Sequence, residues 1–257
     1  GFRNDLPILH FPTCPLFIVF IQLLFRHAKN LSIFADAISK GKPVMKLYIF
    51  DFDGTLGDSR GLIVRTIMDS FDFFGIQRPT VEACIETIGL PLADCFTVSA
   101  HLSDEEGDEC ADKYREIFHR NNVKEAVKPF DGVIGTLNML HGQGKTLAVA
   151  SSRRHESLDG LLADFDITNL FSAIIGADDV VNAKPNPEPV NKILSDLSFS
   201  PSETIVIGDA PYDIMMGKNA GATACGVTYG NGKRDELQEA GADFLIDKFP
   251  DLLTLPI

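Results

Sequence analysis

Residues 47–56 read LYIFDFDGTL, and this stretch decides the fold. The apolar run Leu47–Phe50 predicts a buried strand. Asp51 and Asp53 follow it directly, and in an extended chain two residues at this spacing face the same side. Gly54 permits a tight turn whose amide N–H groups can hold an anion. Because open parallel sheets bind ligands beyond the carboxyl ends of their strands, we expect both carboxylates to face a site.

Three other loops carry polar residues after an apolar run. They contain Ser151 and Ser152, then Lys184, and then Asp209 and Asp213. Taken singly, each has an ordinary explanation as a helix N-cap, a solvated loop charge or a turn, and a lone D-x-D-G is itself most often a solvated turn. Together with the loop at Asp51–Gly54, these three loops follow four different strands at the same end of the sheet. This arrangement predicts one shared site.

The rest of the chain from Lys46 alternates short apolar runs with amphipathic stretches, which is typical of a parallel sheet with crossover helices. The expected strands are Leu47–Phe50, Leu147–Ala150, Ala173–Ile175, Thr204–Ile207, Ala224–Val227 and Phe244–Ile246. The expected helices begin near Gly132, His155, Pro187, Tyr212 and Asp235. The sequence therefore predicts an α/β fold with a doubly wound parallel sheet.

One interval breaks this alternation and predicts an inserted helical domain. Between Ser59 and Lys128 only helical periodicity is found: an apolar stripe ending at Gly75, and a capping box at Ser103–Glu106. The stripe consists of Leu62, Ile63, Ile67, Phe71 and Phe74. We expect residues 45–59 and 129–257 to form the core domain and residues 60–128 a helical cap.

The first 44 residues differ in composition from the remainder. They hold five basic and two acidic residues, whereas the whole chain has 23 basic and 36 acidic ones. The apolar stretch Leu16–Phe25 is too short to cross a bilayer. We expect residues 1–44 to take no part in the core, with a membrane-associating or exported leader as the alternative.

Composition excludes several classes of protein. With 257 residues, 45% hydrophobic and 23% charged, the chain matches average globular usage. A net charge of −13 without a Lys/Arg cluster argues against nucleic-acid binding. The five cysteines show no metal-binding spacing, which favours buried thiols in a reducing compartment, so we expect a cytoplasmic monomer or homodimer.

The four loops resemble the four motifs of the haloacid dehalogenase superfamily in its phosphatase branch. DFDGTLGDS resembles motif I, AVASS motif II, AKPNPEP motif III and VIGDAPYDI motif IV. Further segments, such as KPFDGV at residues 128–133 and GVTYG at 226–230, are similar to the phosphoglycolate phosphatase group. The resemblance implies a Rossmann-like core, and a helical insert of the superfamily's C1 cap type.

The resemblance also implies roles for individual residues. Asp51 would be the nucleophile that forms an aspartyl-phosphate, and Asp53 the general acid and base. Asp51, the backbone carbonyl of Asp53, and Asp209 would hold the metal. The phosphoryl group and substrate would be bound by Ser151, Lys184, Gly54, Thr55, Ser152 and Arg153, and Asp213 would support Lys184 or the metal site.

Charge independently predicts a divalent cation. Two unit charges about 4 Å apart repel by roughly 4 kcal/mol at an effective dielectric constant near 20, and four carboxylates would face an anionic substrate here. Oxygen-only ligands favour Mg²⁺.

We therefore expect Mg²⁺-dependent hydrolysis of the phosphate monoester of a small metabolite, most like phosphoglycolate phosphatase. A β-phosphoglucomutase-like isomerase is the main alternative, because it shares all four motifs. Pyrophosphatase, nucleotidase and sugar-phosphatase specificities stay open, and a non-catalytic binding protein is disfavoured by the intact motif set. Arg153 and the adjacent Arg154 are candidates for meeting a substrate carboxylate.

Overall fold

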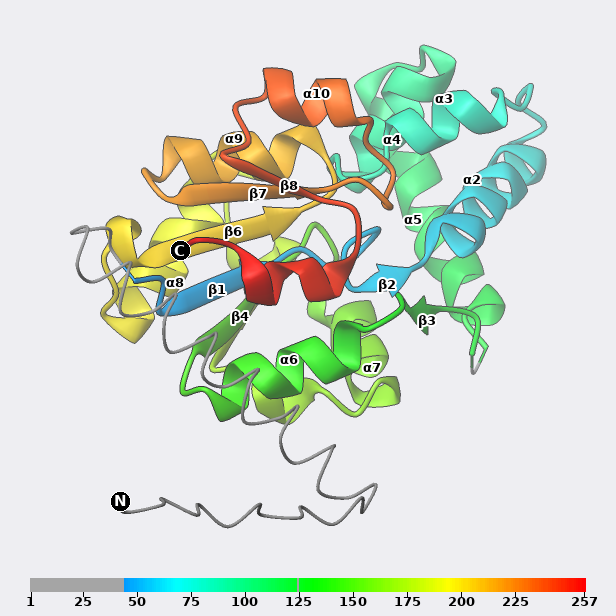
Figure 1. Cartoon of the computed structure of the whole chain (residues 1–257). Helices are drawn as coiled ribbons and strands as arrows, with labels where there is room; N and C mark the ends of the chain where they lie inside the picture. Colours follow the sequence, from blue (N-terminus) through cyan, green and yellow to red (C-terminus); the bar gives the residue numbers. More distant parts are fainter. Residues whose placement is uncertain (1–43, 124) are drawn as a thin grey trace, which may run out of the picture. The chain divides into compact units, whose positions relative to one another are not determined.

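A six-stranded parallel sheet forms the centre of the molecule (Figure 1). The computed structural model describes residues 44–123 and 125–257. The sheet has the order β5-β4-β1-β6-β7-β8. Its strands are β1 (Leu47–Phe50), β4 (Thr146–Ala150), β5 (Ala173–Ile175), β6 (Thr204–Gly208), β7 (Thr223–Val227) and β8 (Phe244–Ile246). All six are parallel, which places their carboxyl ends along one edge.

Helices connect the strands and cover both faces of the sheet. They are α6 (Val133–Gly142), α7 (His155–Asp164), α8 (Glu188–Leu197), α9 (Pro211–Asn219) and α10 (Arg234–Glu239), and the 3₁₀ segment η4 (Phe249–Thr254) follows β8. On one face, Leu47 and Ile49 of β1 pack in a cluster with Val190 of α8 and Met216 of α9. On the opposite face, the ring of Phe50 lies 5.7 Å from that of Phe249 in η4. β1 is therefore buried on both sides, which explains its uninterrupted apolar sequence.

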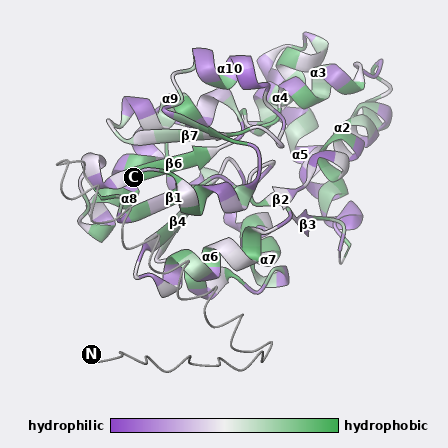
Figure 2. Cartoon of the chain, in the orientation of Figure 1, coloured by the Kyte–Doolittle hydropathy of each residue, from purple (hydrophilic) through white to green (hydrophobic). Residues whose placement is uncertain are grey.

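Hydropathy follows this layering (Figure 2). Hydrophobic residues dominate the central strands, whereas hydrophilic residues colour much of the outer helices such as α10. No helix among residues 44–123 and 125–257 has the length and apolar character needed to span a membrane. Residues 45–255 form one compact unit. The expectation that residues 1–44 take no part in the core lies, but for Val44, outside the described residues.

The predicted doubly wound α/β fold is confirmed. All six expected strands are present, and the five expected helices begin within one residue of the expected positions. The sequence reasoning missed two short strands, β2 (Gly57–Asp58) and β3 (Lys128–Pro129), which pair antiparallel where the chain leaves and re-enters the core. Two residues are too few to show a strand periodicity.

Four helices lie between β2 and β3, and we propose residues 60–128 as the cap. They are α2 (Arg60–Phe74), α3 (Val81–Glu86), α4 (Leu92–Ala100) and α5 (Asp104–Asn121). The Ser103–Glu106 capping box is present at the start of α5, and Gly75 ends α2 in the left-handed conformation with φ 67°. The expected apolar stripe of α2 is buried as far as Phe71, whose ring lies 5.3 Å from that of Phe96. Phe74, the last residue of this stripe, is 37% exposed, because α2 ends there, beyond the packed face.

Candidate active site

The four polar loops meet at the carboxyl edge of the sheet. Asp51 continues β1 by donating its amide to Ile207 O of β6 at 2.9 Å, and Ser151 continues β4 by donating to Ile175 O of β5 at 2.9 Å. The side chains of Asp51, Ser151, Lys184, Asp209 and Asp213 are all buried. The structure thus brings together residues from all four motifs, as the parallel register requires.

Lys184 connects two of the buried carboxylates. Its Nζ lies 2.6 Å from Asp51 Oδ1 and 2.7 Å from Asp213 Oδ1. Burial by itself would lower the pKa of Lys184, but the charges of Asp213 and Asp51 outweigh burial and raise it. Lys184 is therefore a permanent cation. The supporting role expected for Asp213 corresponds to this contact with Lys184.

Asp209 is fixed by the backbone around it. Asn231 N donates to Asp209 Oδ2 at 2.6 Å, and Thr55 Oγ1 donates to Oδ1 at 3.2 Å. A Cβ added to Gly54, whose φ is +82°, would lie 2.1 Å from Asp209 Oδ2, and one added to Gly230 would lie 2.5 Å from the same atom. Both glycines are therefore required for the close approach of the main chain to this carboxylate.

The carboxylates outnumber the cations in this part of the site. One ligand oxygen each from Asp51, Asp209 and Asp213 lie within 4.8 Å of one another. Burial, with contributions from neighbouring carboxylates, raises the pKa of Asp51 well above its ordinary value even though Lys184 opposes the shift. Burial likewise raises the pKa of Asp209 to about 7. An ordinary aspartate is ionised at neutral pH, but the Asp51 carboxylate needs a further cation at this site to be ionised as readily.

This set of side chains fits a hard divalent cation. All three donors are carboxylate oxygens, the ligand type that Mg²⁺ takes in proteins, and a cation would neutralise their excess charge. The carboxylate of Asp53 is turned elsewhere, so only its backbone carbonyl could contribute, as expected from the resemblance.

Asp53 is bound to Arg153 and Ser59. Arg153 donates from Nε to Asp53 Oδ2 and from Nη2 to Oδ1, both at 2.7 Å, and Ser59 Oγ donates to Oδ1. The guanidinium also lies over the ring of Phe118 in α5, 4.9 Å from its centroid. Arg153 was expected to bind substrate, but its fork is occupied by Asp53.

The amides available for a phosphoryl group lie next to Gly54 and at Ser152, but the amide of Gly54 itself is not among them. The amide of Gly54 donates to Gly57 O at 2.9 Å, because the left-handed turn closes a local backbone bond. Among the described residues, the amides of Phe52, Asp53 and Ser152 have no hydrogen-bond acceptor. The Ser152 hydroxyl donates to Gly89 O, 2.9 Å away in the cap, rather than facing the phosphoryl position.

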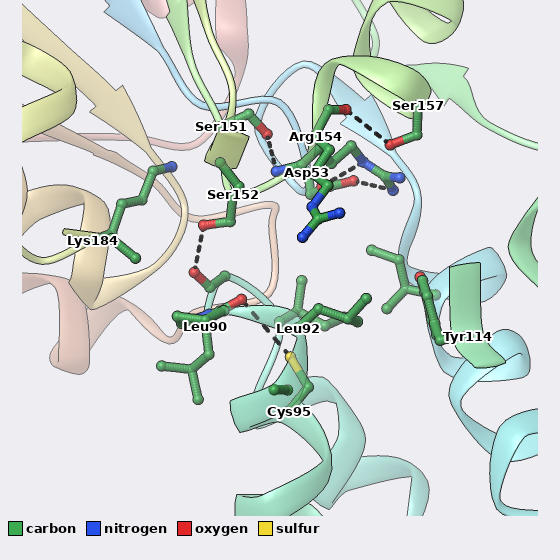
Figure 3. A pocket seen from close by; sticks show the side chains of 18 of the residues that line it. Asp53, Leu90, Leu92, Cys95, Tyr114, Ser151, Ser152, Arg154, Ser157 and Lys184 are labelled. Carbon is green, nitrogen blue, oxygen red and sulfur yellow. Dashed lines mark hydrogen bonds and ion pairs between the residues drawn. The ribbon is translucent and has the colours of Figure 1, made fainter. Parts of the chain in front are cut away.

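A cavity of about 320 Å³ lies between these loops and the cap (Figure 3). Asp51, Asp53, Ser151 and Lys184 line it on the core side. The cap contributes mainly apolar side chains, among them Ile63, Leu90, Leu92, Tyr114 and Phe118.

Several residues at the site were not found from the sequence. Ser59, Arg60, Tyr114 and Asn231 each contact it, yet none lies directly after a strand of the large sheet. Arg60 donates from Nε to Asn231 Oδ1 at 2.8 Å and from Nη2 to Gly230 O, so it ties the start of the cap to the loop that holds Asp209. The glycine-rich run at 226–232 is the sequence signal that could have pointed to a tight loop here, but it does not single out Asn231.

Comparison with known proteins adds the family. The sequence model of the haloacid dehalogenase-like hydrolases matches residues 48–227. Pyrophosphatase PpaX of Halalkalibacterium halodurans is 35% identical over 207 residues, covering 80% of this chain and 94% of the relative. Probable phosphatase IndB of Dickeya dadantii is 33% identical over 210 residues, covering 80% and 91%. A solved haloacid dehalogenase-like hydrolase from Bacteroides fragilis superposes with a TM-score of 0.77 at 27% identity, covering 81% of this chain and 99% of that one.

Proposed function

The chain belongs to the haloacid dehalogenase-like hydrolase family, and on that premise we propose that it is a phosphatase that cleaves the phosphate monoester of a small metabolite. The observation that carries this proposal is Lys184 bridging Asp51 and Asp213, with Asp209 beside them and with amides in the adjoining loops that have no acceptor among the described residues. This arrangement offers one carboxylate for attack and several positive groups for phosphoryl oxygens.

Each residue then has a definite task. Asp51 attacks phosphorus and forms the aspartyl-phosphate, and Asp53 gives a proton to the leaving oxygen and later takes one from water. Lys184 and the amides of Phe52, Asp53 and Ser152 stabilise the charge on the transferring group. Ser151 also lies at this position, and its Oγ accepts from the amide of Arg153 at 3.2 Å.

Mg²⁺ bound by Asp51, Asp209 and the carbonyl of Asp53 would supply the positive charge that lets one anion approach another. The cluster of Asp51, Asp209 and Asp213 supports this choice of metal. Thr55 and Asn231 hold the Asp209 carboxylate in place, so they act on the metal site without contacting substrate.

Inorganic pyrophosphate is a second candidate substrate. The specific observation in its favour is the similarity to a protein named pyrophosphatase PpaX. Cleavage of an anhydride would use the same nucleophile and the same phosphoryl-binding groups.

The test is phosphate release from a panel of alkyl phosphates, aryl phosphates and pyrophosphate, with and without Mg²⁺. We expect turnover of at least one monoester that chelation abolishes and Mg²⁺ restores. Asp51→Asn should reduce this turnover by more than a thousandfold, because covalent catalysis accounts for most of the barrier reduction. Turnover that persists in Asp51→Asn, or an enzyme active on pyrophosphate alone, would contradict the monoester proposal.

A further inference from the structure

Charged side chains around the cavity are paired, with one exception. Arg153 is bound to Asp53, and Lys184 to Asp51 and Asp213. On the cap side, Arg115 is bound to Asp112, and His119 lies 2.8 Å from Glu156. Among the described residues that line the cavity, Arg154 alone is a cation without a carboxylate partner.

The side chain of Arg154 also points into the cavity. Figure 3 shows its side chain extending from the start of α7 into the cavity, beside Asp53 and toward Leu92. Its backbone is fixed, because Arg154 O accepts from the amides of Ser157 and Leu158, both at 3.1 Å. The start of the Arg154 side chain is thus fixed by the main chain, and no carboxylate of the described residues occupies its guanidinium.

A single hydroxyl faces the same space from the cap. Tyr114 is 7% exposed and lines the cavity, and its hydroxyl has no hydrogen-bond partner among the described residues. Burial raises the pKa of Tyr114, so the hydroxyl stays protonated and can donate. Apart from the paired Arg115 and His119, the other cap residues that line the cavity are mainly apolar, among them Leu90, Leu92 and Phe118.

We propose that Arg154, assisted by the Tyr114 hydroxyl, is the specificity-determining residue that binds a carboxylate on the leaving group. This inference rests on the proposed phosphatase function and adds the class of substrate: phosphate esters of small hydroxy-carboxylic acids. One cation matches one carboxylate, and the apolar cap surface suits a carbon skeleton. The second phosphoryl group of pyrophosphate carries more charge than this subsite can neutralise, and a neutral sugar leaves the guanidinium unused.

The experiment compares three substrates that share the phosphoryl group. These are 2-phosphoglycolate, 2-hydroxyethyl phosphate, which replaces the carboxylate by a neutral group, and inorganic pyrophosphate. We expect the wild-type protein to prefer 2-phosphoglycolate. Arg154→Gln should lower its kcat/KM by about 10- to 100-fold, the usual effect of removing a charged hydrogen bond, and change that of 2-hydroxyethyl phosphate by less than about threefold.

Two variants sharpen the assignment. Arg154→Lys should restore part of the preference, because it keeps the charge but loses the fork geometry. Arg115→Gln is the matched control, since Arg115 lines the same cavity with its guanidinium bound to Asp112, and it should leave the preference unchanged. Tyr114→Phe should reduce the preference by about fivefold, as expected for one neutral hydrogen bond.

Binding to Asp51→Asn separates this inference from the proposed function. Calorimetry with Mg²⁺ should give tighter binding of 2-phosphoglycolate than of 2-hydroxyethyl phosphate, and Arg154→Gln in the same background should abolish the difference. Equal binding of the two ligands, or equal losses for both substrates in Arg154→Gln, would overturn the inference while leaving a phosphatase in place. Carboxylate-selective binding by a wild-type protein without turnover would instead refute the proposed function and retain the subsite.

Discussion

The two walls of the active-site cavity are built from opposite kinds of side chain. The core wall buries Asp51, Asp213 and Lys184 in mutual contact at the ends of strands. The cap wall presents Leu90, Leu92 and Phe118, and cap charges such as Lys113 and Glu116 pair with each other away from the core site. A buried charge costs free energy unless it is paired, so it must sit on rigid elements that keep its partner in place. We propose on this basis that the core performs the chemistry, and that the cap excludes water and sets selectivity.

Removing the buried cation should have the largest effect. Lys184→Met leaves Asp51 and Asp213 without their common partner, which typically costs about 3–5 kcal/mol of unfolding free energy. Turnover should fall by more than about a thousandfold, since a charged group on the phosphoryl oxygens is lost as well. Denaturant unfolding and phosphate release measure both effects.

Lys192→Met is the matched control for this prediction. Lys192 lies on α8 close to the same loop but is exposed and donates to Asp179 O at 3.0 Å. It should change neither stability nor turnover measurably. Comparable losses of stability and turnover in Lys184→Met and Lys192→Met would contradict the prediction that the buried lysine differs from exposed ones nearby.

The second prediction concerns pH and metal. Burial raises the pKa of Asp209 to about 7 from an ordinary value of 3.8, so the metal-free folded protein holds a proton that the unfolded chain has already released. This contribution to stability is present below about pH 4 and is lost as the pH rises through 7. The loss reaches at most about 4 kcal/mol, because one pKa unit corresponds to about 1.4 kcal/mol.

We therefore expect the Tm of metal-free protein to fall as the pH rises from about 4 to about 7, and Mg²⁺ to reverse the fall by binding the ionised carboxylates. Thermal unfolding with and without chelator measures this. Asp209→Asn should reduce the pH dependence over this range, and the part that remains comes from Asp51, whose pKa burial also raises. If Mg²⁺ leaves the Tm at pH 8 unchanged, the carboxylate cluster is not a metal site.

The third prediction is a smaller effect on Mg²⁺ affinity. It tests whether Arg60, at the start of the cap, supports the metal site in the core. Arg60→Gln removes both contacts to Gly230 and Asn231, whose amide holds Asp209. Residues that orient metal ligands typically change metal affinity by about 10- to 100-fold. We expect Mg²⁺ binding, followed by calorimetry, to weaken by about 10-fold. Arg65→Gln, on the same helix but bound to the Asn121 carbonyl, should leave it unchanged.

The smallest expected effect is on KM, from the hydrogen bond between Ser152 of the core and Gly89 of the cap. Ser152→Ala removes the hydrogen bond to Gly89 O, worth about 1 kcal/mol. KM for a preferred metabolite should rise by about fivefold as the cap closes less firmly, whereas kcat for a small aryl phosphate stays the same. A large fall in kcat would instead assign the Ser152 hydroxyl to the phosphoryl group, as the sequence had suggested.

Much of the sheet and of the core wall could be predicted from the sequence for one physical reason. A strand buried on both faces must be a continuous apolar run, and the polar residues that end such runs must gather at one edge when the strands are parallel. Leu47–Phe50 and Thr204–Ile207 were recognisable on this basis, together with Asp51 and Asp209 beyond their ends, and the second strand extends one residue further, to Gly208. The strands β2 and β3 carry no such pattern, because a two-residue ladder is fixed by its surroundings.

What the sequence by itself determined is therefore which residues could do chemistry, since that information is local to each strand end. Only the tertiary structure decided which hydrogen-bond or ion-pair partner each of these side chains has. Arg153 and Arg154 are adjacent and chemically identical in the sequence, yet one is bound to Asp53 under Phe118 and the other faces the cavity. The packing of the cap on the core separates them: Asp53 and Phe118 lie 65 residues apart in the chain, and both contact the guanidinium of Arg153. Contacts between distant segments depend on packing geometry, which no local pattern of residues encodes.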